Sequence, residues 1–265
     1  MKRVFTIVLL SFMAVMMNAQ PKVVGHRGCR DVEGQYENTI SSLNYAYQIG
    51  CDAVEFDVQM TKDSNIVVFH GPKVPGHKKT INEMTFEEAR SVVLPGGFQM
   101  PTLEEYFDAA MKLGDMPVIL EIKNQPTKEL NVIAAEKVVE IVKKYGMKPQ
   151  KLEFTAFSRT VLTRINELLD GYKTIYLASG VHVSSAAYAK EMGFTGISYD
   201  LNAWLNHPEI MAEARELGIE TTVWLTNHND VIDWAIKHRA DYVSTDFPAP
   251  AVKYVKTIKK RTSKK

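Results

Sequence analysis

Short apolar runs alternate with longer segments of helical period from residue 22 onward, and this alternation restricts the fold more than any other feature of the sequence. The apolar runs are expected to form strands at residues 22–27, 53–59, 66–70, 117–123, 151–157, 173–178, 196–200, 220–226 and 241–245. Helices are expected between most of them, among others at residues 37–49, 102–113, 129–145 and 160–169. A helical crossover returns the chain for parallel pairing, so the alternation predicts an α/β fold with a parallel sheet.

One run does not fit this parallel pattern. The run at 66–70 follows the run at 53–59 after only the polar stretch Thr61–Asn65. A parallel connection needs about a dozen residues or more, so this run is expected to fold back as an antiparallel hairpin strand. The remaining runs then predict a TIM-type (β/α)8 barrel, for which about 250 residues are typical. Glycines in the C-cap position, each after a helical stretch and before a strand, support this: Gly114, Gly146, Gly193 and Gly218.

Residues 71–101 form a less regular stretch, rich in proline and glycine, around one short helical piece at 86–91. We expect an insertion that caps the barrel mouth rather than a second domain, so the barrel spans 20–252. The basic tail at 253–265 has few apolar residues, and a frayed, solvated end is favoured over a membrane or nucleic-acid patch. The formal net charge of +1 calls for no polyanionic partner, so a small anionic substrate has to be recognised by individual residues.

Residues 1–19 have the pattern of a secretory signal peptide. A charged start precedes an almost entirely apolar run at 4–17, and a small residue, Ala19, follows. The run is shorter than the roughly 20 residues that a membrane span needs, and no cysteine follows it for a lipid anchor. We therefore expect export to the periplasm or the cell exterior. The chain has two cysteines, Cys29 and Cys51, which are expected to be packing residues rather than a disulfide.

Carboxylates occur inside two of the apolar runs, near the ends that should meet at the barrel mouth. Glu55 and Asp57 are two residues apart and share a face, where like charges need a cation or a raised pKa; buried salt bridges are the alternative. Glu121 on a later run adds a third carboxylate, and the hairpin brings His70 roughly level with Asp57. Three carboxylates without cysteine, with the imidazoles left free, predict a site for Mg²⁺ or Ca²⁺ rather than zinc.

Two imidazoles and two cationic side chains are expected at the same mouth. His26 ends the first strand, and Gly28 indicates that the chain turns there, which lets Arg27 face the mouth as well. Lys123 shares a strand face with the third carboxylate. A divalent metal with arginine and lysine beside it suits a phosphate group, and two histidines suit general acid and base catalysis.

Short segments along the chain resemble, in order, the signature of glycerophosphodiester phosphodiesterases. They are His26-Arg27-Gly28, Glu37-Asn38-Thr39, Glu55-Phe56-Asp57, Val67-Val68-Phe69-His70, Pro101-Thr102-Leu103-Glu104-Glu105, Glu121-Ile122-Lys123, Trp224 to Asn227 and Thr245-Asp246. The resemblance covers 22–250 and implies a barrel with one divalent metal, Mg²⁺ or Ca²⁺. The residues it implies are Glu55, Asp57 and Glu121 for the metal, His26 and His70 as the acid and base pair, Arg27 and Lys123 at the phosphate, and Trp224 on the glycerol side.

The resemblance further implies a reaction. A free glycerol hydroxyl attacks phosphorus, the alcohol leaves, and water opens a cyclic phosphate, which gives glycerol 3-phosphate. Gly71 stands where the family usually has Asp after the second histidine, and Tyr36 where it usually has Pro. Two alternatives therefore stay open: a phospholipase-type phosphodiesterase that acts on intact lipid, and a non-catalytic relative that binds phosphodiesters. For Trp224 the alternative is core packing.

Overall fold

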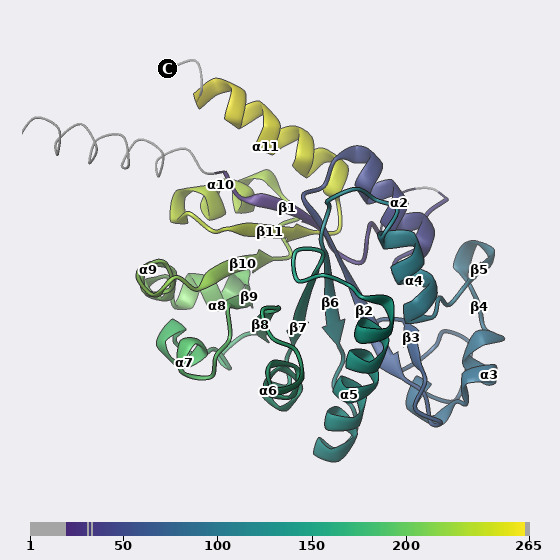
Figure 1. Cartoon of the computed structure of the whole chain (residues 1–265). Helices are drawn as coiled ribbons and strands as arrows, with labels where there is room; N and C mark the ends of the chain where they lie inside the picture. The colour runs from purple at the N-terminus through teal and green to yellow at the C-terminus, as the bar shows by residue number, and fades with distance from the viewer. Residues whose placement is uncertain (1–19, 31, 33, 263–265) are drawn as a thin grey trace, which may run out of the picture.

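The computed structural model describes residues 20–30, 32 and 34–262, and Figure 1 shows a barrel of strands surrounded by helices. The barrel strands run parallel in the order β1-β11-β10-β9-β8-β7-β6-β2, and β1 pairs with β2 to close the ring. Their bounds are β1 Lys22–Gly25, β2 Ala53–Met60, β6 Val118–Ile122, β7 Leu152–Ala156, β8 Lys173–Ala178, β9 Gly196–Asp200, β10 Glu220–Trp224 and β11 Tyr242–Thr245. The predicted TIM-type barrel is confirmed.

The predicted hairpin is also present. Strand β3, Ile66–Val68, pairs antiparallel with the last residues of β2, which extend past the pairing with β1. Thr61 closes the turn, because its backbone and hydroxyl both bond to Asn65. Ile66 and Val68 of β3 join the main hydrophobic core, whereas Val67 and the following Phe69 belong to a second hydrophobic cluster.

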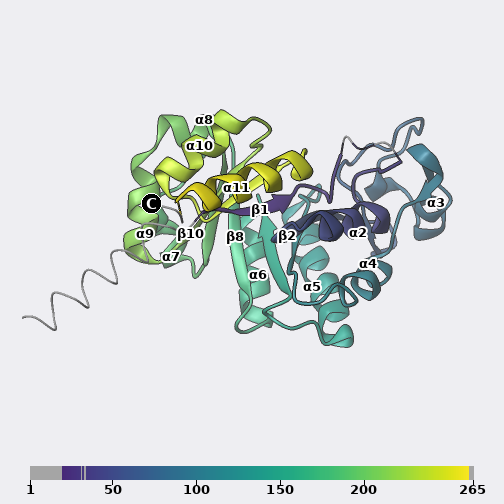
Figure 2. The same ribbon diagram turned by 90° about the horizontal axis from the view of Figure 1, so that it is seen from above.

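Residues 71–101 supply the other side of this second cluster. They contain η1 Ile81–Glu83, α3 Phe86–Arg90, η2 Pro95–Gly97 and a small hairpin of β4 Val93–Leu94 and β5 Phe98–Gln99. In Figures 1 and 2 this insertion lies at one edge of the molecule, away from α7 and α9. Its buried side chains, such as Ile81 and Met100, pack against Val67 and Phe69.

The helices lie outside the barrel and bury their apolar faces against the strands. Their bounds are α2 Ile40–Ile49, α4 Leu103–Ala110, α5 Lys128–Tyr145, α6 Arg159–Leu168, α7 Ala186–Glu191, α8 Leu201–Asn206, α9 Glu209–Leu217 and α10 Asn229–His238. The helix predicted from residue 37 begins only at Ile40, because Thr39 caps it and shares a capping box with Ser42. No helix in the part of the chain that the structure describes is long and apolar enough to cross a bilayer.

The C-terminal segment differs from the frayed end that we expected after residue 252. Helix α11, Pro248–Thr262, runs through that boundary and packs against β1, α2 and α10 (Figure 2). Val252 and Val255 are buried on its inner side, while Lys253 and Lys256 are exposed. The apolar residues recur at helical spacing among the lysines, and this periodic stripe holds the segment on the barrel.

Candidate active site

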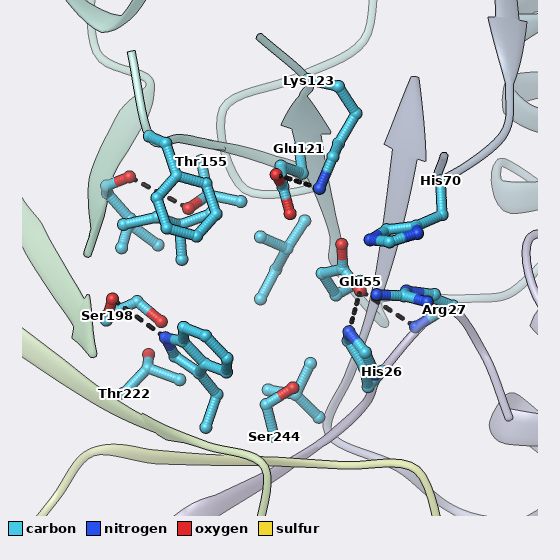
Figure 3. A pocket seen from close by; sticks show the side chains of 16 residues that line it. His26, Arg27, Glu55, His70, Glu121, Lys123, Thr155, Ser198, Thr222 and Ser244 are labelled. Atoms are coloured by element: carbon cyan, nitrogen blue, oxygen red, sulfur yellow. Dashed lines mark hydrogen bonds and ion pairs between the residues drawn. The ribbon is translucent and has the colours of Figure 1, made fainter. Parts of the chain in front are cut away.

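A cavity of about 170 Å³ opens at the carboxyl ends of the barrel strands, the usual place for a site in this fold. Figure 3 shows the side chains that line it. Seven of the eight predicted site residues are among them: His26, Arg27, Glu55, His70, Glu121, Lys123 and Trp224. Asp57 is fully buried directly behind them.

The three predicted carboxylates lie together. Asp57 on β2 is the register partner of Glu121 on β6, and Glu55 lies two residues earlier on β2. One oxygen from each carboxylate lies within 4.8 Å of the others, and each residue has a buried oxygen that accepts no hydrogen bond. Buried carboxylate oxygens without donors are costly unless a cation binds them. The cluster therefore fits a hard divalent cation.

Burial and mutual repulsion shift the pKa values of this cluster apart. Burial, together with Asp57, raises the pKa of Glu121 to about 7. Burial, Asp57 and Glu121 raise the pKa of Glu55 well above its usual range. Burial opposes ionisation of Asp57 too, but the nearby cations outweigh it and lower its pKa to about 2. In the metal-free protein the three groups are not all ionised at neutral pH.

Asn38 holds the most buried of these carboxylates in place. Its side-chain amide donates to Asp57 Oδ2 at 2.8 Å, and its carbonyl oxygen accepts from the Asp57 backbone N–H at 2.9 Å. Asn38 adopts a φ of 59°, in the left-handed region that Asn tolerates better than most residues. Asn38 was predicted only as part of the segment Glu37-Asn38-Thr39, without a role; in the structure it orients Asp57.

Two cations lie against the carboxylates. The Lys123 ammonium is 2.7 Å from Glu121 Oε1 and 3.4 Å from Asp57 Oδ1, as ion pairs without hydrogen-bond alignment. Arg27 Nε is 3.2 Å from Asp57 Oδ2, and its Nη1 atom bonds to Glu37. These contacts hold the Lys123 and Arg27 side chains at the cavity wall, beside the carboxylate cluster that fits a metal ion.

The turn after β1 points Arg27 into the cavity. Arg27 and Gly28 have φ values of 54° and 83°, so the strand ends and the chain reverses as expected. A Cβ atom at Gly28 would lie 2.7 Å from the backbone carbon of Ser42, which leaves room only for glycine. The same turn lets the Arg27 backbone N–H donate to Glu55 Oε2 at 2.9 Å.

His26 is held by a carboxylate that the sequence analysis did not assign. Its Nδ1 atom is 2.6 Å from Asp246 Oδ1, and its Nε2 atom is 4.0 Å from Glu55 Oε2. Asn227 donates to the other Asp246 oxygen at 2.9 Å and accepts from the Asp246 backbone N–H. Burial raises the pKa of Asp246, but the bond with His26 outweighs it, so the net pKa is lowered. An ionised Asp246 accepts from Nδ1–H, which leaves Nε2 on the cavity side.

His70 has no such partner. Strand register places Phe69 opposite Asp57, so His70, predicted to be roughly level with Asp57, lies one residue beyond it. The chain leaves the strand at that point, and the His70 ring still lines the cavity. No hydrogen bond to this ring occurs among the described residues. Burial lowers the pKa of His70 to about 4, with Lys123 contributing and Asp57 partly opposing.

The opposite cavity wall is uncharged. Trp224 and Phe157 meet edge to face with ring centroids 6.4 Å apart, and the Trp224 indole N–H donates to the Ser198 carbonyl at 3.2 Å. Isoleucine, leucine, threonine and serine side chains from β7 to β11 complete this wall: Thr155, Ile175, Leu177, Ser198, Thr222 and Ser244. Of these residues only Trp224 was predicted from the sequence. The sequence offered one further signal: Thr222 lies two residues before Trp224 and therefore faces the same side of the strand.

Comparisons with known proteins agree with this geometry. Residues 26–250 match the model of the glycerophosphoryl diester phosphodiesterase family. The crystal structure of a glycerophosphodiester phosphodiesterase from Parabacteroides distasonis is 30% identical and aligns over 93% of this chain and 99% of that chain with a TM-score of 0.85. A glycerophosphodiester phosphodiesterase from Caldanaerobacter subterraneus is 24% identical over 248 residues, 88% of this chain and 97% of the relative.

A more distant structure shares the fold. It is a phosphodiesterase from Oleispira antarctica, solved in complex with the product sn-glycerol-3-phosphate. It is 21% identical and covers 89% of this chain and 97% of that chain, with a TM-score of 0.78.

Proposed function

Because this chain belongs to the glycerophosphoryl diester phosphodiesterase family, we propose that it is a metal-dependent enzyme that hydrolyses glycerophosphodiesters to glycerol 3-phosphate and an alcohol. The observation that carries the proposal is the combination in one cavity of a buried three-carboxylate cluster, two cations and two imidazoles. A cation and positive side chains stabilise the charge that develops on phosphate oxygens, and imidazoles transfer protons.

Glu55, Asp57 and Glu121 would hold one divalent cation, Mg²⁺ or Ca²⁺. The closeness and burial of one oxygen from each residue support this assignment, since oxygen ligands are what both ions prefer. When bound, the ion supplies positive charge to the phosphate oxygens. Arg27 and Lys123 line the cavity beside this site and would bind the phosphate from the protein side.

His70 and His26 would divide the two proton transfers. The lowered pKa of His70 keeps its ring neutral at neutral pH, so it is suited to accept the proton of the attacking glycerol hydroxyl. His26 presents Nε2 to the cavity while Asp246 accepts from Nδ1–H, so His26 protonated on both nitrogens would donate the Nε2 proton to the departing alcohol oxygen and be left neutral. The roles reverse when water opens the cyclic phosphate. Trp224 would contact the glycerol carbons on the uncharged wall.

Purified protein incubated with glycerophosphocholine tests the proposal. Release of glycerol 3-phosphate that stops with EDTA and with His26→Ala supports it. The matched control is His207→Ala, because His207 is exposed and lies outside the cavity. Bound metal without turnover of any phosphodiester overturns the proposal in favour of a binding protein. Turnover only of intact lipid vesicles overturns it in favour of a phospholipase.

We further propose that the protein is exported. The support is the pattern of residues 1–19 in the sequence, which lie outside the described residues. Cell fractionation compares the full chain with a chain that begins after residue 19. Retention of the full chain inside the cell, with residues 1–19 still attached, contradicts export.

A further inference from the structure

The insertion contains a short lysine-rich hairpin just after His70. Lys73 and Thr80 form an antiparallel bridge, which closes the hairpin at its base. Val74, only 2% exposed, anchors the segment in the second hydrophobic cluster. Residues 73–80 are therefore an ordered element with a fixed position on the molecule, and we call them the lysine hairpin.

Two lysines of this hairpin have no acidic partner. Lys79 forms an ion pair with Glu88. Lys73 and Lys78 are both exposed, and in the part of the chain that the structure describes neither takes part in an ion pair or a side-chain hydrogen bond. The hairpin therefore presents two uncompensated positive charges to the solvent.

The lysine hairpin begins beside the charged side of the cavity. The His70 ring lines the cavity, next to Arg27 and Glu55 in Figure 3. A Cβ atom at Gly71 would lie 3.4 Å from the Lys73 carbonyl oxygen, so the chain turns tightly after His70. Three residues of chain reach at most about 10 Å, which is about one Debye length at 0.1 M ionic strength. A charge at Lys73 therefore acts on an anionic group that is bound at the mouth.

Most of the positive charges around the mouth lie on this side. The connections from β7, β8, β9, β10 and β11 to the next helix contain no lysine or arginine, and Arg159 at the start of α6 bonds to the Tyr188 hydroxyl. On the charged side, Lys123 follows β6, and Arg30 follows β1 but lies 3.4 Å from Glu37. A negatively charged group is therefore attracted toward the lysine hairpin rather than toward the uncharged wall.

The cavity already has enough positive charge for one phosphodiester. When a divalent cation is bound, the three ionised carboxylates balance it and one of the two cationic side chains, Arg27 or Lys123. The other cationic side chain matches the single negative charge of the phosphodiester. The lysines of the hairpin exceed this need, and the uncharged wall offers no counter-charge to an anion on the glycerol half. A second anionic group therefore belongs to the other half, the alcohol that leaves.

We infer that the lysine hairpin recognises a phosphate monoester on the leaving alcohol, and that the protein prefers glycerophosphodiesters whose alcohol is phosphorylated. This inference rests on the proposed function and adds the chemical class of the alcohol. Attraction between exposed charges is screened by salt, so the preference should be strongest at low ionic strength.

Two ligands that differ only in this group test the lysine hairpin. They are glycerophosphoinositol and its 4-phosphate, which each have one phosphodiester bond and differ by about two negative charges. Calorimetry with His26→Ala protein in Mg²⁺ at pH 8 measures both affinities independently of turnover. We expect the 4-phosphate to bind about 10-fold more tightly at about 20 mM salt and about equally at about 500 mM salt.

Two double variants in the same protein identify the source of the preference. Lys73→Gln combined with Lys78→Gln should reduce the low-salt preference to about 2-fold or less, because both uncompensated charges are removed. Lys112→Gln combined with Lys148→Gln is the matched control, since these exposed lysines precede β6 and β7 at the opposite end of the barrel, and it should leave the preference unchanged. Equal melting temperatures show that both double variants are folded.

The outcomes separate this inference from the proposed function. A preference that is absent, insensitive to salt or unchanged without the two hairpin lysines overturns the inference, while release of glycerol 3-phosphate from glycerophosphocholine by the wild-type protein still supports the function. A salt-dependent preference that the hairpin variant loses supports the inference as an anion site, even where the wild-type protein hydrolyses neither ligand and the function fails. Equal affinity for both ligands, together with salt-dependent sedimentation on phosphatidylglycerol vesicles, assigns the hairpin to a lipid surface and also overturns the inference.

Discussion

The two walls of the cavity come from different parts of the chain and differ in chemistry. The charged wall consists of side chains from β1, β2, β3 and β6 and the turns after them: His26, Arg27, Glu55, His70, Glu121 and Lys123. The wall from β7 to β11 has aromatic, aliphatic and hydroxyl groups without a charge. Substitutions on the charged wall should therefore change the rate of bond breaking, whereas substitutions on the uncharged wall should change binding of the glycerol half.

One residue from the uncharged side of the barrel contacts the charged wall. Asp246 follows β11, the last strand on the uncharged side, but its carboxylate bonds to His26. The parallel pairing of β1 with β11 closes the barrel and brings them together. Ring closure therefore places a charged group from the last barrel strand beside His26, which follows the first strand.

Loss of one carboxylate should have the largest effect. We expect Mg²⁺ or Ca²⁺ to raise the melting temperature of the wild-type protein and Glu121→Gln to abolish this rise, because one of the three proposed metal ligands becomes neutral. Calorimetric scans with and without metal check this. A full metal-dependent shift in the variant would remove Glu121 from the site.

The same variant has a second, pH-dependent consequence. The pKa of Glu121 rises from 4.5 to about 7 in the metal-free fold, so its ionisation destabilises the folded state as pH increases from about 4.5 to 7. Without metal at pH 8, Glu121→Gln should therefore melt above the wild-type protein, and this advantage should disappear at pH 4. A lower melting temperature than wild type at pH 8 would contradict the raised pKa.

Removal of an imidazole should come next. We expect His70→Ala to lower kcat by about 10²–10⁴-fold with little change in KM, since the proposed role of the side chain is proton transfer. Steady-state kinetics with glycerophosphocholine measure both constants, and His77→Ala, an exposed histidine of the insertion, is the control. A raised KM with unchanged kcat would assign His70 to recognition and break the contrast between the walls.

Asp246→Asn should have a smaller effect on the same constant. An amide in place of the carboxylate no longer stabilises the imidazolium form of His26 that would donate its Nε2 proton, and we expect a loss of about 10–100-fold, less than for removal of an imidazole. We expect this loss in kcat and not in KM. Asp241→Asn is the matched control at the opposite end of β11. A stronger effect on KM would make Asp246 part of the binding surface.

The uncharged wall should respond in the opposite way. We expect Trp224→Leu to raise KM about 10-fold, the equivalent of about 1.4 kcal/mol, with kcat little changed, because aromatic contact with the glycerol half is lost. Trp234→Leu serves as the control, since Trp234 stacks on His238 outside the cavity. A fall in kcat without a change in KM would mean that the wall positions the reacting groups.

The sequence predicted the charged wall better than the uncharged one. Carboxylates and histidines inside apolar strands are conspicuous because burial makes them costly, and strand parity places Glu55 and Asp57 on one face. Ser198 and Ser244 are ordinary strand residues until the barrel closes, so no local pattern separates them from structural serines. Asp246 was visible only within a family segment, since its contact with His26 depends on the β1–β11 pairing.

The fold prediction had a similar limit: local patterns predicted the strands, but not an element that is held by contacts with distant segments. Strand positions and the antiparallel return of β3 follow from periodicity and the length of one turn. The last helix was missed because its lysines dominate the composition of the tail, whereas Val252 and Val255 are too few to stand out. What holds α11 in place is its contact with β1 and α2, which no local pattern reports.

Restoring a carboxylate beside the second histidine is the smallest change and sharpens the comparison between His26 and His70. Gly71 has no positive φ, and a Cβ atom there would meet its nearest neighbour, the Lys73 carbonyl oxygen, at 3.4 Å, so Gly71→Asp should fold. An added carboxylate favours the protonated imidazole and should raise the low pKa of His70. If His70 is the base, the acid limb of the kcat profile moves to higher pH, with kcat at pH 8 changed by less than about 10-fold. Gly71→Asn, which adds similar bulk without charge, should leave the limb in place, and an equal shift in both variants would show that charge at this position is not what sets the basicity of His70.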